Sequence, residues 1–221
     1  MTDELQPGVG EPQLPIIEVF ENQPRLAGCL PRVSKPGELC PLFSEVVPDM
    51  TDAELAEAVG KVTLKHLAIV LDQDGVGSCA TEAAAQAVMI ARATGANVPP
   101  VLLNPWFIYH TTSGGRDGGS NIEDNLVFAR DKGVVPESVW PRSKGWRSKP
   151  SDEAYAAAQN FRILEFYDLT TVRQMRTALA KGFPVVWGAN GHALCKAVDV
   201  IVDDPEMKTR VYTAPDYKKK P

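Results

Sequence analysis

The sequence predicts an α+β protein in which a helical lobe is followed by a β-sheet lobe. Segments with helical periodicity, most of them ending at a glycine, lie between residues 51 and 182. Runs of β-branched residues separated by turns follow between residues 183 and 213. Helices that precede a block of strands are typical of α+β architecture. The 221 residues, 44% of them hydrophobic, suffice for one core or for one domain made of two lobes.

Residues 1–48 are predicted to form an extended N-terminal arm. They contain eight of the 18 prolines and show no sustained periodicity. Proline fixes φ and lacks the amide donor, so such a segment favours extended backbone. We expect the arm to lie along a surface of its own domain or of a partner through its apolar residues. The remaining residues, 49–221, are assigned to the main domain.

Capping signals place two helices in the first half of the chain. The sequence TDAE at residues 51–54 is a capping box, and Gly60 is expected to end the short helix that it begins. The sequence SNIE at 120–123 is a second capping box, and this helix is expected to run to Gly133. Its apolar face is predicted to contain Ile122, Leu126 and Ala129.

Between these two helices, an alanine-rich segment predicts a central, buried helix over residues 79–94 that ends at Gly95. A short helix is expected to begin after Asn104, with Pro105 at its first position. Three aromatic residues of this short helix are predicted to lie in the core: Trp106, Phe107 and Tyr109.

The second half of the chain alternates at first and then becomes strand-rich. Residues 151–159 predict a helix, and residues 170–182 predict another with Val172, Met175 and Leu179 on one face. Apolar or β-branched runs predict extended segments at 66–71, 161–167, 183–188, 192–202 and 209–213.

The composition disfavours several classes of partner. The net charge of −5 argues against nucleic acid and anionic membranes, and no apolar run is long enough to span a membrane. The first 15 residues lack the features of a signal peptide, so we expect a cytoplasmic or virion-associated protein with free thiols. A Cys29–Cys40 disulfide is the alternative for two of the four cysteines.

The segment DQDGVGSCATEAAAQAV, residues 72–88, holds the candidate reactive residue. Small residues allow a tight turn into the alanine-rich helix, and Cys79 would be placed at the helix N-terminus. The dipole there favours a thiolate. The same pattern also suits an ordinary strand-to-helix turn with a buried structural thiol.

The three histidines limit the residues available to pair with this cysteine. His66 and His110 are interpreted as partly buried polar residues, which leaves His192. His192 and Cys195 would point to opposite faces of a strand, so we expect no metal site there.

Several stretches, in the same order along the chain, resemble papain-like cysteine peptidases. The segment QDGVGSCA is similar to the family's Q-G-x-x-G-S-C-W, with Gln73 six residues before Cys79. LNPWFIYH, GGS at 118–120, KGVVPESVWP and LAKGFPVVWG followed by GHAL are similar to further segments of the family. The matches cover residues 66–200 and leave the arm unexplained.

The resemblance implies a papain-like two-lobed fold and an acyl-transfer site. Cys79, on the central helix of the helical lobe, would be the nucleophile, and His192, in the sheet lobe, would be the general acid–base. The Gln73 side chain and the Cys79 N–H would form the oxyanion hole. Gly118 and Gly119 would contact extended substrate backbone, and neither metal nor cofactor is implied.

Four departures from the family pattern define what is unusual here. Asp74, Val76 and Ala80 replace the usual glycine, cysteine and tryptophan, and no N-S-W-G segment follows His192. Asp216 is the nearest polar candidate for a third member of the site.

Two functions follow from this pattern. The first is a cysteine peptidase acting on peptide or protein substrates. The second is a papain-fold structural or binding module of a larger assembly such as a virion, joined through the arm, with little or no catalysis. A cell-wall amidase is disfavoured because its usual D-C-S-G context is absent.

Overall fold

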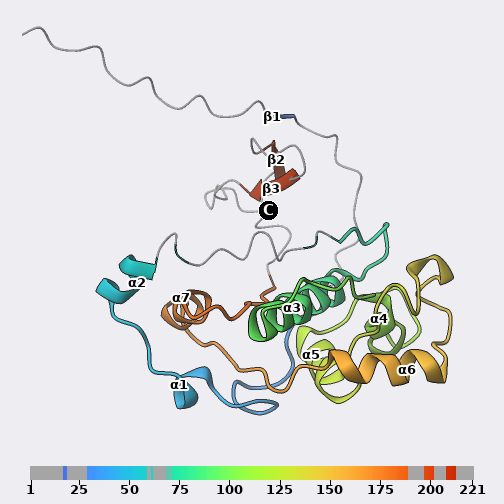
Figure 1. The fold of residues 1–221 in the computed structure, drawn as a ribbon, viewed down its shortest axis with the longest axis horizontal. Helices are drawn as coiled ribbons and strands as arrows, with labels where there is room; N and C mark the ends of the chain where they lie inside the picture. Colours follow the sequence, from blue (N-terminus) through green and yellow to red (C-terminus); the bar gives the residue numbers. More distant parts are fainter. Residues whose placement is uncertain are drawn as a thin grey trace, which may run out of the picture. The chain divides into compact units, whose positions relative to one another are not determined.

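The computed structural model describes residues 29–58, 61, 69 and 71–188, together with three strands near the chain ends. Two compact units divide the chain. One comprises Arg25–Gly188, and the other combines Met1–Pro24 with Ala189–Pro221. The first unit is mostly helical (Figure 1).

The described α-helices all belong to the first unit. They are α1 (Phe43–Val46), α2 (Asp52–Ala58), α3 (Cys79–Ala96), α4 (Trp106–Thr112), α5 (Ile122–Asp131), α6 (Asp152–Ala158) and α7 (Val172–Ala180). Two 3-10 turns accompany them, at Arg142–Lys144 and Gln159–Phe161. The longest helix, α3, contacts α4 and α5, as Figure 1 shows.

The core of this unit is built around α3 from small and medium-sized apolar side chains. Alanines on α3 let neighbouring backbones approach closely, and this accounts for the buried position that the sequence predicts. The cluster consists of Ala84, Ala85, Val88 and Met89 of α3 with Leu103, Ile108, Ala129 and Val134. Its burial fixes the helix that begins at the candidate nucleophile.

A second cluster, rich in aromatic residues, lies around α4 and α6. Phe107 is fully buried, and its ring meets those of Trp140 and Phe128 edge-on, with centroids 6.2 and 5.6 Å apart. The cluster comprises Trp106, Phe107, Tyr109, Val135, Trp140, Trp146, Ala154 and Ala158. The prediction that Trp106, Phe107 and Tyr109 lie in the core is confirmed.

The helix ends agree with the capping signals in some places and differ in others. The Thr51–Glu54 capping box forms, with the Thr51 N–H bound to the Glu54 carboxylate at 2.7 Å. At α5 the N-cap is Asn121, and Ser120 instead accepts a hydrogen bond from the Asn125 side chain at 3.0 Å. The expected second capping box is therefore absent from this described helix start.

Helix α3 runs two residues beyond its predicted end. Gly95 lies inside the helix, and Asn97 takes the left-handed conformation at the C-cap, with φ of 50°. Asparagine tolerates this conformation better than most residues, so it ends the helix where glycine was expected to do so.

Helix α7 forms as predicted, but its buried face differs. Val172 and Leu179 are 63% and 43% exposed, whereas Gln174 and Thr177 are buried. The Gln174 side chain accepts from the Thr170 N–H at 2.7 Å, and the Thr177 hydroxyl accepts from the Met50 N–H at 3.1 Å. Polar contacts with neighbouring backbone therefore decide which face is turned inward.

Two predicted strands are absent from the described part of the chain. Residues 161–167 and 183–188 have extended or irregular backbone without strand pairing. Next to the first of these, an isolated bridge joins Leu42 and Asp168. A β-branched run becomes a strand only when a neighbour supplies a ladder of hydrogen bonds. Among the described residues, the first run makes only two separate backbone hydrogen bonds, from the Val134 N–H to the Phe161 carbonyl and from the Ile163 N–H to the Ala129 carbonyl, and these form no ladder.

The second unit contains a three-stranded antiparallel sheet. Its strands are β1 (Ile17–Glu18), β2 (Ala197–Ile201) and β3 (Lys208–Tyr212), in the order β1-β2-β3. The extended runs predicted over 192–202 and 209–213 agree with β2 and β3. The turn between them lies outside the described residues, as do residues 189–196. The sheet lobe bearing His192 stays a prediction.

The boundary predicted at residue 48 differs from the division into units. The unit that begins at Arg25 includes α1, and Phe43 of that helix is only 2% exposed. Strand β1 belongs to the other unit and pairs with β2. Whether residues 1–48 can be removed without unfolding the rest stays a prediction.

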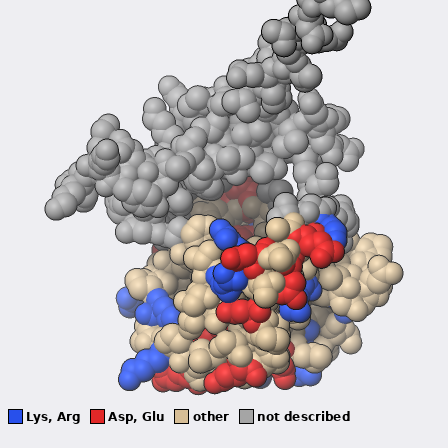
Figure 2. Space-filling model, turned by 90° about the vertical axis from the view of Figure 1, so that its left-hand side faces the viewer, with Lys and Arg blue, Asp and Glu red and all other residues tan. Residues whose placement is uncertain are grey.

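Figure 2 shows one face of the molecule, on which acidic and basic side chains occur next to one another. The ion pair between Arg173 of α7 and Asp52 of α2, 2.7 Å long, joins charges of both signs in this way. No helix in the described ranges is long and apolar enough to cross a membrane.

Candidate active site

The candidate nucleophile, Cys79, is the first residue of α3 and follows a tight turn. A hydrogen bond from the Val76 N–H to the Gln73 carbonyl, 2.9 Å long, closes this turn. Asp74 and Gly75 both have positive φ, 51° and 74°, which reverses the chain direction within a few residues. The turn therefore places Gln73 close to the start of the helix.

Gln73 and Cys79 are half-buried, so solvent and reagents reach both side chains. Ser78, between them, is fully buried, and its carbonyl accepts hydrogen bonds from the N–H groups of Thr81 and Glu82, both 2.9 Å. The Cys79 thiol thus lies at the positive end of an 18-residue helix. Negative charge that develops next to this thiol during a reaction is therefore stabilised by the helix dipole.

A buried carboxyl group lies one turn into α3. Glu82 is 8% exposed, and its Oε1 accepts from the Ser78 hydroxyl at 3.1 Å. Arg142 approaches the same oxygen at 3.4 Å, while Oε2 is buried without a hydrogen-bond partner. Burial raises the pKa of Glu82 to about 7, against the opposing effects of Arg142 and Ser78.

Arg142 connects the helix to the turn that carries Gln73. Its guanidinium donates to the Asp72 carbonyl at 2.6 Å as well as to Glu82. The same group lies 5.3 Å from the centre of the Trp106 ring, a cation–π contact. One side chain therefore holds Asp72, next to Gln73, against the first turn of α3.

The two glycines predicted to contact substrate lie in a loop before α5. Gly118 is exposed and Gly119 is buried. The Gly119 N–H donates to the Tyr109 hydroxyl at 3.1 Å, so it already has an acceptor within the protein. Backbone pairing of a substrate with this loop would rely on the exposed Gly118 and on carbonyl groups. Substrate contact here stays a prediction.

Residues 29 and 30 lie directly beside this loop. Cys29 forms a parallel bridge with Ser120, and the Leu30 N–H donates to the Ser120 carbonyl at 3.0 Å. Burial raises the pKa of the Cys29 thiol, and nearby Cys79 and Glu123 add to the effect. The predicted arm thus passes close to the candidate nucleophile, which the sequence did not indicate.

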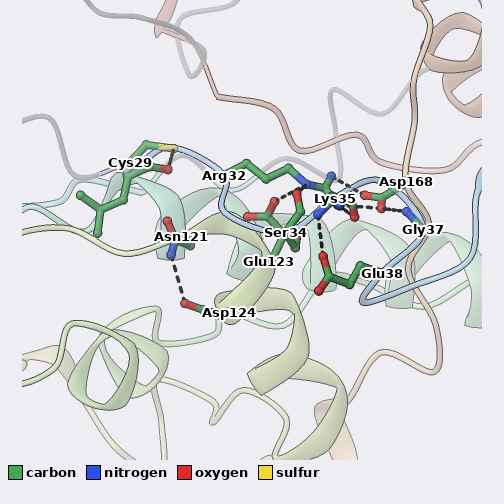
Figure 3. A network of polar contacts seen from close by, with 11 residues as sticks. Cys29, Arg32, Ser34, Lys35, Gly37, Glu38, Asn121, Glu123, Asp124 and Asp168 are labelled. Atoms are coloured by element: carbon green, nitrogen blue, oxygen red, sulfur yellow. Dashed lines mark hydrogen bonds and ion pairs between the residues drawn. The ribbon is translucent and has the colours of Figure 1, made fainter.

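Arg32 holds this part of the chain in place, as Figure 3 shows. Its guanidinium donates to both carboxylate oxygens of Asp168, at 2.6 and 2.8 Å, and its Nε pairs with Glu123 at 2.9 Å. Burial alone would raise the pKa of Asp168, but hydrogen bonds from Arg32 and the Gly37 N–H bring it below the usual value. The contacts that hold this part of the chain are therefore charged and partly buried.

The arm was expected to lie along a surface of its own domain or of a partner through its apolar residues. Phe43 fits this expectation, because its ring meets those of Tyr167 and Phe183 edge-on. Leu30 and Val33, also in the arm, are 42% and 87% exposed. Over residues 29–39 polar contacts replace the apolar ones, and Cys29 and Cys40 are free thiols without the alternative disulfide.

The described residues therefore bring part of the predicted site together. Gln73 and Cys79 share the start of α3, and the loop of Gly118 and Gly119 lies next to the same turn. His192 and Asp216 lie outside the described residues, so their roles stay predictions. His110 is half-buried, and its Nδ1 lies 3.2 Å from the Trp146 carbonyl, as its interpretation as a partly buried polar residue predicts.

Sequence reasoning missed the polar residues that surround the start of α3. Glu82 and Arg142 gave no signal beyond their charge, and Tyr109 was assigned to the core without a polar role. Asp117, directly before the GGS segment, was given no role. Within the described ranges, no group of three or more His, Cys, Asp or Glu residues could hold a metal ion.

No protein-family model matches the chain. An uncharacterized peptidase C1-like protein of Acanthamoeba polyphaga mimivirus is 29% identical in an alignment of 142 residues that covers 58% of this chain. The chain spans 46% of the length of that relative.

Two solved structures are similar to the chain. Xylellain, a cysteine protease from Xylella fastidiosa, is 25% identical with a TM-score of 0.58, over 75% of this chain and 67% of its own. Procathepsin L 3 of the Tenebrio molitor larval midgut is 16% identical with a TM-score of 0.48, over 66% and 47% of the two chains. The resemblance to papain-like cysteine peptidases is confirmed by the first structure and the viral relative.

Proposed function

We propose that this chain is a cysteine-type peptidase that cleaves peptide or protein substrates through Cys79 and His192. The observation that carries the proposal is the position of Cys79. It is a half-buried thiol at the first residue of a buried helix, six residues after the half-buried Gln73. The similarity to xylellain, described as a cysteine protease, supports the same assignment.

In the proposed reaction the Cys79 thiolate attacks the carbonyl carbon of a peptide bond. An S–C bond forms and the carbonyl π electrons move to oxygen, where the Gln73 amide and the Cys79 N–H donate hydrogen bonds. When the intermediate collapses, the C–N bond breaks and the His192 imidazolium protonates the leaving amine. Water, deprotonated by the neutral imidazole, then hydrolyses the thioester and releases the thiol.

Labelling with an epoxysuccinyl peptide tests this proposal directly. The thiolate opens the epoxide to form a thioether, and the epoxide oxygen takes up a proton. We expect the adduct at Cys79, its loss in Cys79→Ser and its slowing in His192→Ala. Cys40 should stay unlabelled because burial, the largest of several causes, raises its pKa to about 11. Cys29→Ser serves as the matched control and should keep the adduct.

Peptide mapping by mass spectrometry reads out the site and the rate together. The peptidase assignment fails if Cys79 reacts no faster than Cys29 and Cys40. It also fails if His192→Ala leaves the rate at Cys79 unchanged, because the imidazole would then have no part in activating the thiol.

The alternative is a papain-fold binding module of a larger assembly such as a virion, located in the cytoplasm or in the particle. Two observations favour it: the chain's own residues 29 and 30 lie beside the candidate substrate loop, and no N-S-W-G segment follows His192. This function would be preferred if the labelling experiment fails while the protein remains folded.

A further inference from the structure

Three hydrogen bonds join the turn before Cys79 to the loop at Gly119. Asp117 Oδ1 accepts from the Gly77 N–H at 2.7 Å and from the Tyr109 hydroxyl at 2.8 Å. The same hydroxyl accepts from the Gly119 N–H at 3.1 Å. A continuous chain of hydrogen bonds therefore runs from one backbone segment to the other through two side chains.

The surroundings of this chain leave little freedom. Tyr109 is fully buried on α4, with its ring 5.2 Å from that of Trp146. Burial raises the pKa of Tyr109 to about 12, so the hydroxyl keeps its proton at neutral pH. A Cβ at Gly77 would lie 3.0 Å from Asp117 Oδ1, 3.3 Å from the Tyr109 oxygen and 3.4 Å from the Gly119 nitrogen. Turn and loop are in close contact at this point.

We propose that Tyr109 and Asp117 are positioning residues that set the distance between Cys79 and the backbone of the Gly118–Gly119 loop. The inference rests on the proposed peptidase function. Gly77 precedes the nucleophile by two residues, and the loop is where extended substrate would pair. Fixing both segments through one carboxylate and one hydroxyl would align a bound peptide with the thiol before reaction.

This role separates two kinds of thiol reagent. Iodoacetamide needs only an accessible thiolate, because it is small and makes no backbone pairing. An epoxysuccinyl peptide must meet the thiol and the loop at the same time. Loss of the hydrogen-bond chain should therefore slow the peptide reagent and leave iodoacetamide little affected.

The test measures the ratio of the two second-order rate constants at Cys79. In Tyr109→Phe we expect the ratio to fall about tenfold, because the variant loses both the hydrogen bond donated to Asp117 and the one accepted from the Gly119 N–H. Tyr155→Phe is the matched control, since it removes the same hydroxyl from an aromatic residue outside the chain of hydrogen bonds. Its ratio should equal that of the wild type.

Two variants at position 117 show whether the carboxylate acts through its acceptor oxygen. Asp117→Asn keeps Oδ1 as an acceptor for Gly77 and Tyr109, so its ratio should remain close to the wild-type value. Asp117→Ala removes the acceptor and should lower the ratio as Tyr109→Phe does. If Tyr109 and Asp117 had a merely structural role, Tyr109→Phe and Asp117→Ala would lower the stability of the protein without changing the ratio of the two rate constants.

Hydrogen exchange at the Gly77 and Gly119 amides tests the coupling independently of catalysis. In Tyr109→Phe the Gly119 amide loses its acceptor, and Gly77 should also exchange faster because Asp117 loses its second anchor. Faster exchange at Gly119 alone would overturn the coupling. An unchanged reagent ratio in Tyr109→Phe would overturn the positioning role while the peptidase function stands. If wild-type Cys79 is not selectively labelled, the proposed function fails first, and the role inferred from it fails too.

Discussion

The first turn of α3 and the middle of the same helix both contain buried side chains, but these have opposite surroundings. The middle is packed in apolar side chains, and its residues Ala84, Ala85, Val88 and Met89 are at most 1% exposed. Around the first turn, Ser78 and Thr81 are fully buried and Glu82 is 8% exposed. Hydrogen bonds, including those to the buried Glu82 carboxyl group, hold that end, whereas shape complementarity holds the middle.

The difference shows how one helix can be both rigid and chemically specific. Apolar packing in the middle fixes the axis of α3 and contributes most of the stability. Polar groups at the start determine which donors and acceptors face the turn around Cys79, although burying a carboxyl group costs free energy. The first turn and the middle of α3 should therefore respond differently to mutation and to pH.

The largest effect is expected in the apolar middle. Met89→Ala should lower the free energy of unfolding by about 3–4 kcal/mol, because it leaves a cavity beside Leu103 in a fully buried cluster. Urea denaturation at pH 5 and pH 8 should show the same loss at both values. Met175→Ala, at a half-buried position of α7, is the control and should cost less.

The second effect distinguishes the first turn from the middle of α3, because only the first turn makes the free energy of unfolding depend on pH through Glu82. In the folded protein burial raises the pKa of Glu82 from 4.5 to about 7. The folded state then binds more protons than the unfolded state between these values, so stability is highest below pH 4.5 and falls as the pH rises to about 7. Glu82→Gln should remove this fall, worth about 3 kcal/mol.

Unfolding curves of the wild type and Glu82→Gln, measured from pH 4 to pH 8, check this expectation. The two free energies should diverge as the pH rises, with the variant the more stable at pH 8. Parallel curves would show that Glu82 titrates alike in both states, and the contrast between the first turn and the middle of α3 would lose its electrostatic basis.

The third effect concerns Arg142, which faces Glu82 from outside the helix. Arg142→Met removes the positive charge that lowers the Glu82 pKa, so the fall in stability should move to higher pH. The variant should also lose about 1–2 kcal/mol through its lost hydrogen bonds to Glu82 and to the Asp72 carbonyl. Arg130→Met is the control, because Arg130 pairs with the exposed Asp131.

The same denaturation series reads out this prediction. The pH at which stability falls is compared between Arg142→Met, Arg130→Met and the wild type. An unchanged midpoint in Arg142→Met would mean that Arg142 does not interact with the charged form of Glu82. The first turn would then be held by Ser78 alone.

The sequence was sufficient to predict α3 and its first residue because small side chains and turn glycines act locally. Alanine content indicated burial, and the glycines before Cys79 indicated the turn. The resemblance to known peptidases added Gln73 and the substrate loop. These features depend on residues near one another in the chain, which is why they could be read in advance.

The missed features depend on contacts between distant segments. Residues 161–167 have strand composition but no strand-pairing partner among the described residues. Helix α7 turns Gln174 inward because the side chain accepts a hydrogen bond from the Thr170 N–H. Asp117 lies 40 residues from Gly77, to which it is hydrogen-bonded. No periodicity encodes such a pairing, so the polar surroundings of Cys79 emerged only from the structure.

The smallest effect is expected at the far end of α3, where neither apolar packing nor buried charge acts. Gly95 lies inside the helix, and a Cβ there would meet none of the described residues within 4 Å apart from its chain neighbours and the helix's own backbone. Gly95→Ala should raise the free energy of unfolding by about 0.5–1 kcal/mol, because alanine loses less backbone entropy on folding. The matched variant, Asn97→Ala, should lower it by about 1 kcal/mol, since φ of 50° at the C-cap disfavours a residue with a plain Cβ. Thermal or urea unfolding of the two variants decides the matter. Equal and opposite shifts would confirm that α3 ends at Asn97, whereas a destabilised Gly95→Ala would mean that Gly95 is itself the helix end that the sequence predicted.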